Sequence, residues 1–119
     1  MTVEATIYVT LKNLVSNRVY RDIAPPTVTA LPRITFQQVG GRAVNFLGPG
    51  TPSKKNAVFQ INIWAADRDE VAALSRAVED AMRAAVGVSV TVNAAPVAIY
   101  EPETKLFGTR QDFGIWYDN

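Results

Sequence analysis

The 119-residue sequence contains no cysteine and no histidine. The lack of cysteine excludes disulfides, thiolate catalysis and metal sites that depend on thiolate ligands. The lack of histidine removes the commonest general base and the commonest transition-metal ligand. No apolar run approaches the roughly 18 residues of a membrane-spanning helix, and no secretory signal pattern opens the chain. We therefore expect a protein that folds in the cytoplasm where it is made and has no membrane partner.

Excess charge of either sign is also missing, because 12 basic and 11 acidic residues give a net charge of +1. Dedicated nucleic-acid-binding proteins usually carry a strong basic excess, so this class is disfavoured. A length of 119 residues suits one domain and is too short for two. We expect residues 1–119 to fold as a single domain.

Two helices are predicted from apolar spacing. In residues 3–16, Ile7, Leu11, Leu14 and Val15 recur at helical intervals after a capping Thr2. The β-branched residues of this segment leave a strand over 5–11 as the alternative. A second helix is predicted from Asp67 as its cap to about residue 86, before Gly87. Its apolar stripe consists of Val71, Leu74, Val78, Ala81, Met82 and Ala85, and its solvent face of Arg76, Glu79, Asp80 and Arg83.

Alternating or β-branched segments predict the strands. The clearest covers 57–65, where Phe59, Ile61 and Ile63 share one face. Further strands are predicted at 18–20, 33–39, 88–92, 97–101 and 107–117, the pair 88–92 and 97–101 being either two strands or one interrupted strand. The order of elements indicates an α+β fold with a mainly antiparallel β-sheet and two α-helices packed on one face.

Residues 40–56 are rich in glycine and proline, which predicts a long loop. Structureless loops of this length are uncommon and usually functional or disordered. One interpretation is a flexible surface loop. The other is a β-arm, in which Gly40 and Gly41 form a hairpin turn that pairs 34–39 with 42–47.

No catalytic arrangement is evident. A dyad of Ser53 with Lys54 or Lys55 would lie on a solvated loop. The acidic pairs Asp67/Asp69 and Glu79/Asp80 are explained by a helix start and a helix solvent face. Residues 48–55 lack the Gly-Lys-Ser/Thr order of a phosphate loop, and 67–70 lack the glycine and distal glutamate of a calcium loop. We expect no catalytic residue, no cofactor and no metal site.

Trp64 and Trp116 lie on two of the predicted strands. Tryptophan in a strand packs well on a sheet face or edge. It is also enriched among the residues that dominate protein interfaces. Both interpretations stay open for these two side chains.

Several features in order resemble the tail completion, or tail terminator, proteins of long-tailed bacteriophages. After the first helix come Val19-Tyr20 and the prolines Pro25 and Pro26. Leu31-Pro32-Arg33-Ile34 then opens a strand, and Ile63-Trp64 runs into the helix 68–86. The sequence of the closing strand is Arg110-Gln111-Asp112-Phe113-Gly114-Ile115-Trp116. The resemblance covers nearly the whole chain.

The resemblance implies a non-enzymatic structural protein that forms a homo-oligomeric ring, typically a hexamer. Such a ring caps the head-proximal end of the tail tube, stops its polymerisation and joins it to the neck or connector protein in the virion tail. DNA passes through the lumen without specific binding, and assembly takes place in the host bacterial cytoplasm. For the contact with the tube or a neighbouring ring we expect Arg42, Phe46, Leu47, Lys54 and Lys55, and for subunit contacts Trp64 and Trp116.

Three alternatives remain. The chain could be a neck-ring or head-tail connector protein of similar fold. It could be a small ferredoxin-like module that binds a ligand between sheet and helices. An enzyme that uses carboxylates alone ranks last, because the acidic residues are spread along a helix and loops.

Overall fold

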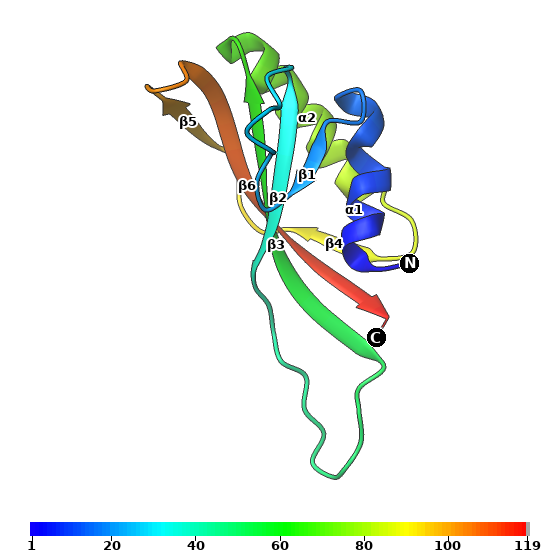
Figure 1. The fold of residues 1–119 in the computed structure, drawn as a ribbon. Helices are drawn as coiled ribbons and strands as arrows, with labels where there is room; N and C mark the ends of the chain where they lie inside the picture. Colours follow the sequence, from blue (N-terminus) through cyan, green and yellow to red (C-terminus); the bar gives the residue numbers. More distant parts are fainter. Residues whose placement is uncertain (119) are drawn as a thin grey trace.

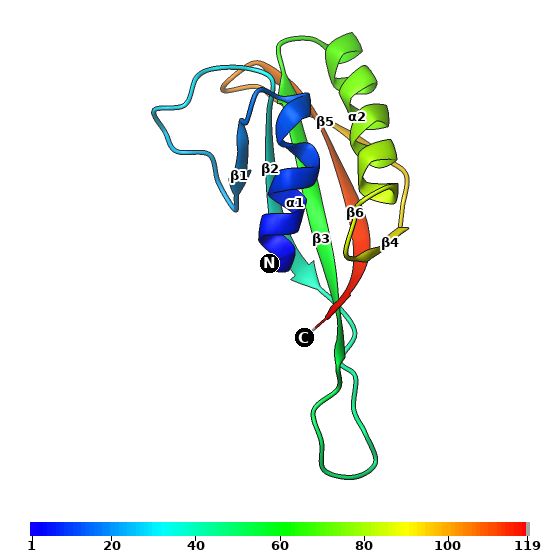
Figure 2. The same cartoon turned by 90° about the vertical axis from the view of Figure 1, so that its right-hand side faces the viewer.

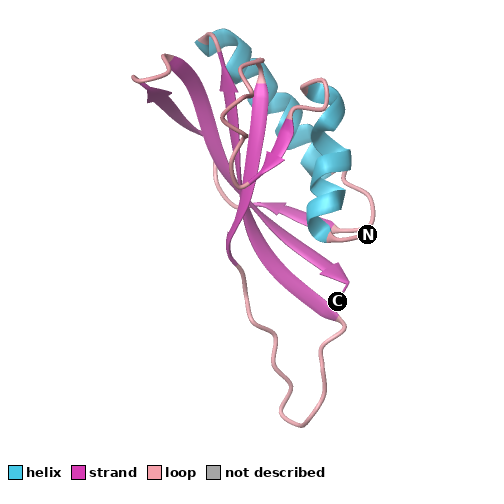
Figure 3. Cartoon of the chain, viewed as in Figure 1, coloured by secondary structure: helices cyan, strands magenta, loops and turns pink. Residues whose placement is uncertain are grey.

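A computed structural model describes residues 1–118 of the chain (Figures 1 and 3). These residues form two α-helices, one short 3-10 helix and a six-stranded sheet. The elements are α1 (Val3–Leu11), η1 (Lys12–Leu14), β1 (Val19–Arg21), β2 (Arg33–Gly40), β3 (Lys54–Ala65), α2 (Arg68–Arg83), β4 (Ser89–Val92), β5 (Val97–Glu101) and β6 (Leu106–Asp118). The predicted α+β class is confirmed. Neither helix in the described part of the chain is long and apolar enough to span a membrane.

The sheet has the order β1-β2-β3-β6-β4, and β5 also pairs with β6. Only β1 and β2 are parallel; every other pair is antiparallel. The two longest strands, β3 and β6, pair along their whole length from Lys54–Asp118 to Ala65–Phe107. Residues 88–92 and 97–101 were predicted to form either two strands or one interrupted strand. They form two separate strands, β4 and β5, which pair with different halves of β6.

Both helices cover the same face of the sheet (Figure 2). The alternation of β3 and β6 turns one set of side chains toward the helices and leaves the other set on the uncovered side, called here the open face. The buried core lies between helices and sheet and includes Ile7, Leu11, Ile34, Phe59, Ile61, Val78, Met82, Phe113 and Ile115. The predicted placement of two helices on one face is therefore correct.

Helix α1 forms despite its β-branched residues because Val3, Ile7 and Leu11 are all buried at helical spacing. Thr2 caps it by accepting a hydrogen bond from the Ala5 N–H. The helix is shorter than the predicted 3–16. It tightens into η1 and ends before Ser16 and Asn17, both of which adopt positive φ.

Helix α2 begins as predicted, with the Asp67 carboxylate accepting from the Glu70 N–H at 2.8 Å. It ends at Arg83 rather than near residue 86, because the turn around Ala84 leaves helical geometry before Gly87. The predicted solvent-exposed face of α2 is wrong for Glu79. Glu79 is half-buried and contacts β6.

Of the two interpretations of residues 40–56, the β-arm is wrong. Strand β2 pairs with β3, with Ile34 opposite Ile63 and Phe36 opposite Ile61. Ile34, Phe36, Ile61 and Ile63 are all buried in this pairing, whereas every residue of 42–47 is exposed. Residues 41–53 instead form a loop without strand pairing, called here the β2–β3 loop, which projects away from the body (Figure 1).

Candidate interaction surfaces

The β2–β3 loop lengthens the molecule to 52 Å along one axis against 25 and 24 Å along the others (Figures 1 and 2). Its tip, defined here as Val44, Phe46 and Leu47, exposes apolar side chains. Phe46 is 56% exposed and Leu47 is fully exposed. A contiguous group of exposed apolar side chains on a projecting segment is typical of a protein interaction site.

The base of the loop is fixed by Asn56 at the start of β3. Its side-chain oxygen accepts a hydrogen bond from the Arg42 N–H at 2.8 Å, and its amide donates to the Ile115 carbonyl at 3.3 Å. Gly41 passes so close that a Cβ there would lie 2.4 Å from the Asn56 carbonyl oxygen, and its φ of +148° favours glycine. The tip is therefore held out by an ordered base.

The five predicted interface residues divide between base and tip. Arg42, Lys54 and Lys55 line one cavity of about 350 Å³ at the base, so the structure places these three cations around a single cavity, to which Val44 also contributes. Lys54 also forms an ion pair with Asp118 on β6. Phe46 and Leu47 lie farther out, at the tip.

Trp64 lies on the open face, against Gly108 of β6. A Cβ at position 108 would be 2.7 Å from the Trp64 ring and 2.7 Å from the Ile63 carbonyl oxygen. The glycine thus provides the flat surface on which the indole packs. The ring is half-buried, so the side chain combines sheet packing with an accessible edge.

Trp116 lies at the other end of the same face. It pairs with Asn56, eight residues before Trp64 on β3, which separates the two tryptophans by about 27 Å along the strand. Trp116 borders an open depression of about 540 Å³ that Gly114, Arg42, Thr91 and Asn93 also line. The structure therefore does not bring the two tryptophans together.

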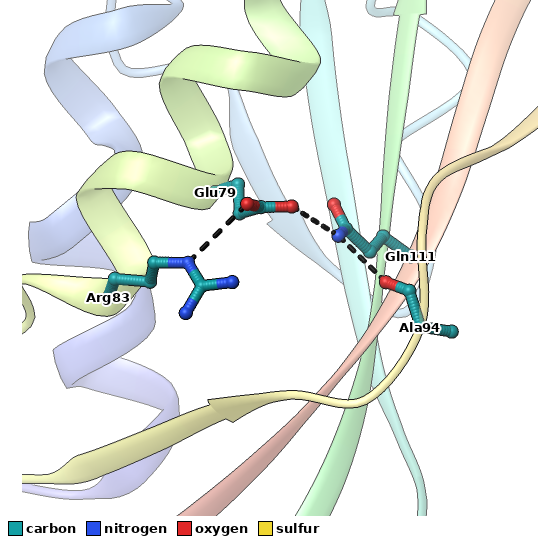
Figure 4. A network of polar contacts seen from close by, with 4 residues as sticks. All are labelled: Glu79, Arg83, Ala94 and Gln111. Atoms are coloured by element: carbon teal, nitrogen blue, oxygen red, sulfur yellow. Dashed lines mark hydrogen bonds and ion pairs between the residues drawn. The ribbon is translucent and has the colours of Figure 1, made fainter.

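Glu79, Arg83 and Gln111 form a polar network under the connection between β4 and β5 (Figure 4). The buried Gln111 amide donates to Glu79 at 2.8 Å and to the Ala94 carbonyl at 2.9 Å. This hydrogen bond from Gln111, followed by the hydrogen bond and charge of Arg83, lowers the pKa of Glu79, while partial burial opposes the shift. The network joins α2, β6 and the 93–96 connection, and it therefore stabilises the fold.

Arg68, at the start of α2, holds the β5–β6 hairpin. Its guanidinium donates to the Gly108 and Ile99 carbonyl oxygens, both at 2.8 Å, and lies 5.3 Å from the centre of the Phe107 ring. The sequence interpretation missed Arg68, Asn56, Gly108 and Gly114. Gly108 and Gly114 could have been singled out from the sequence, because a glycine inside a strand often marks a place where another group approaches the backbone closely.

The acidic residues form no reactive cluster. Asp67 caps α2, and Asp69 and Glu70 are exposed in its first turn. Among residues 1–118, no group of three or more metal-ligating side chains comes together.

The sequence matches the family model described as tail completion protein gp17 over residues 8–118. No curated protein sequence matches the chain at a significant level. Among solved structures, a chain from the virion of a native gene transfer agent particle superimposes with a TM-score of 0.64 at 21% identity, covering 98% of this chain and 95% of that one. A second solved structure, without a descriptive name, gives a TM-score of 0.52 at 11% identity and covers 100% and 97%.

At these identities the two solved structures establish a shared fold only. The family model covers almost the whole chain and therefore decides the family. The predicted resemblance is confirmed: the chain belongs to the tail completion protein gp17 family, whose members are structural proteins of phage tails.

Proposed function

We propose that this chain acts as a single domain and assembles into a ring, a hexamer by the family resemblance. The ring caps the head-proximal end of the tail tube, stops tube polymerisation and joins the tail to the neck. The observation that supports this most is the exposed apolar tip of the β2–β3 loop on a chain of the tail completion family. Apolar side chains held out on an ordered base suit a contact that forms only during assembly.

Ring closure requires two different patches on each subunit, so that successive copies meet head to tail. Among residues 1–118, the short strands β1, β4 and β5 each pair with only one other strand, and the second edge of each is the proposed place for a neighbouring copy to pair or pack. Trp64 and Trp116 on the open face are proposed as subunit contacts. Trp116 is the stronger of the two, because it borders an open depression, whereas Trp64 is already packed on Gly108.

The β2–β3 loop is proposed to contact a neighbouring component of the tail, either the tube or an adjoining ring. Arg42, Lys54 and Lys55 at its base supply charge, and Phe46 and Leu47 at its tip supply apolar area. The protein would act without catalysis, in the neck region of the virion. A net charge of +1 suits a lumen through which DNA passes without being held.

Two measurements test the proposal. Light scattering of the purified protein should give a ring-sized mass, about six times the 13.0 kDa of the chain for a hexamer. A phage that carries serine at positions 44, 46 and 47 should produce tails of uncontrolled length or heads without tails in electron micrographs. The loop length stays unchanged in this variant, so only the apolar surface is lost.

Normal tail length and normal joining in the serine variant would refute the role of the loop. A ring that binds isolated necks but ignores tube ends would instead identify a neck-ring protein of similar fold. A protein that stays monomeric or dimeric and whose stability changes when a small ligand is added would favour the alternative of a ferredoxin-like binding module.

A further inference from the structure

Three basic side chains surround the cavity at the base of the β2–β3 loop. Arg42 lies where the loop leaves β2, and Lys54 and Lys55 lie where the chain returns to the sheet as β3 (Figure 1). Thr51 also lines the cavity. The sequence has no aspartate or glutamate in residues 23–66, so the loop and the two strands that carry it bring no acidic side chain to this place.

Only one of these three cations has an acidic partner among residues 1–118. Lys54 forms an ion pair with Asp118 at the end of β6, whereas Arg42 and Lys55 form none within this part of the chain. Arg42 donates its main-chain N–H to Asn56, which leaves its guanidinium available to a partner. Three cations and one carboxylate leave two unbalanced positive charges at the loop base among the described residues.

Apolar side chains adjoin these cations. Ala43 and Val44 line the same cavity, and Phe46 and Leu47 are exposed just beyond it at the tip. A protein surface offers carboxylates next to apolar side chains, whereas the backbone of duplex DNA offers phosphates and sugars. A carboxylate, that of Asp118, already contacts one of the three cations. The loop base therefore fits an acidic protein surface better than a nucleic acid.

We propose that the cavity at the loop base receives carboxylate side chains of the tail component that the β2–β3 loop contacts. The proposal rests on the tail-joining function proposed above and adds the chemistry of the partner surface, which is acidic residues beside apolar ones. The guanidinium of Arg42 can bind both oxygens of one carboxylate, and Lys55 adds a point charge. Charged pairs around an apolar contact steer the encounter and fix its orientation, while the tip supplies buried apolar area.

Arg42→Glu and Lys55→Glu, combined in the full-length chain, test the site. Both side chains are exposed, and the main-chain hydrogen bond from residue 42 to Asn56 does not depend on the arginine side chain, so the fold should tolerate the changes. Cosedimentation with isolated tail tubes and, separately, with isolated necks measures binding. We expect rings of wild-type mass that bind their component at least about tenfold more weakly, because like charges then face each other.

The matched control combines Arg76→Glu with Lys105→Glu. These exposed cations lie on α2 and in the β5–β6 turn, away from the loop, and their reversal changes the net charge equally (Figure 1). The control should bind like the wild type. Chemical amidation of the carboxylates on tubes or necks should weaken wild-type binding as strongly as the double reversal does. The component for which it does so is the partner.

Binding of the reversed variant, or of the wild type to amidated tubes and necks, at undiminished strength would overturn the carboxylate site, as would an equal loss in the control. Loss of duplex DNA binding alone would assign the cavity to phosphates, and dissociation of the ring would assign it to a neighbouring copy; either result overturns the proposal. Wild-type rings that bind neither tubes nor necks would instead overturn the tail-joining function itself.

Discussion

The indole ring of Trp64 lies directly on Gly108 of the neighbouring strand, leaving no space for a side chain at position 108. A Cβ there would come within 2.7 Å of both the ring and the Ile63 carbonyl oxygen. The two residues are register partners in the β3–β6 pair, which forms the centre of the sheet. The open face is therefore packed at this point, although no helix covers it.

Gly108→Ala should lower the free energy of unfolding by about 1–3 kcal/mol, because the methyl group must displace either the indole or a strand backbone. Urea unfolding followed by tryptophan fluorescence measures the change. Gly48→Ala is the control, since a Cβ at Gly48 would meet no atom within 4 Å. Equal stability of the two variants would contradict the close packing.

Asn56→Ala should loosen the base of the β2–β3 loop, because Arg42 and Ile115 each lose a hydrogen-bond partner. We expect faster proteolytic cleavage within residues 41–53 and a loss of about 1 kcal/mol of stability. Limited proteolysis with mass spectrometry measures the cleavage rate. Asn45→Ala, within the exposed part of the loop, should leave the rate unchanged.

Arg68→Lys should destabilise the β5–β6 hairpin while keeping the charge. A lysine cannot reproduce the two hydrogen bonds of the guanidinium to the Gly108 and Ile99 carbonyls, so we expect a loss of about 1–2 kcal/mol. Hydrogen exchange should rise first in β5. Arg76→Lys, at an exposed position of the same helix, is the control. Similar rates of hydrogen exchange in β5 for the two variants would refute the role of Arg68 in holding the β5–β6 hairpin.

Protonation of Glu79 should lower the free energy of unfolding in acid. Its pKa is lowered in the folded state, chiefly by the hydrogen bond from Gln111 and then by Arg83. A lowered folded pKa contributes stability above the unfolded pKa, and this contribution is lost as the pH falls through the folded pKa. The stability advantage of the wild type over Glu79→Gln should therefore be largest at neutral pH and shrink in acid.

Urea unfolding of both proteins across the acid range measures this trend. Asp80→Asn removes a negative charge from the same helix and serves as the control for general charge effects, because it leaves the Gln111 contact in place. An advantage of the wild type that does not change with pH would show that the ionisation of Glu79 is not linked to folding.

Local patterns in the sequence were sufficient for the main elements. The alternation of Phe59, Ile61 and Ile63 and the helical spacing of Val71, Val78 and Met82 predicted β3 and α2, because each pattern matches the period of its element. The Asp67 cap was also predictable, since capping acts over three residues. The family could be recognised because these elements follow one another in a fixed order along the chain.

Only the tertiary structure decided which segments pair and which stay free. The Gly40-Gly41 hairpin failed because β3 offered β2 a buried partner, a choice that depends on residues about 25 positions apart and not on turn chemistry. The contacts of Glu79 with Gln111, Arg68 with Ile99, and Asn56 with Arg42 likewise join segments that the sequence separates. Local propensity acts within a few residues, whereas burial is shared among all the elements that form the core, so the ordered base of the β2–β3 loop forms only once the chain is folded.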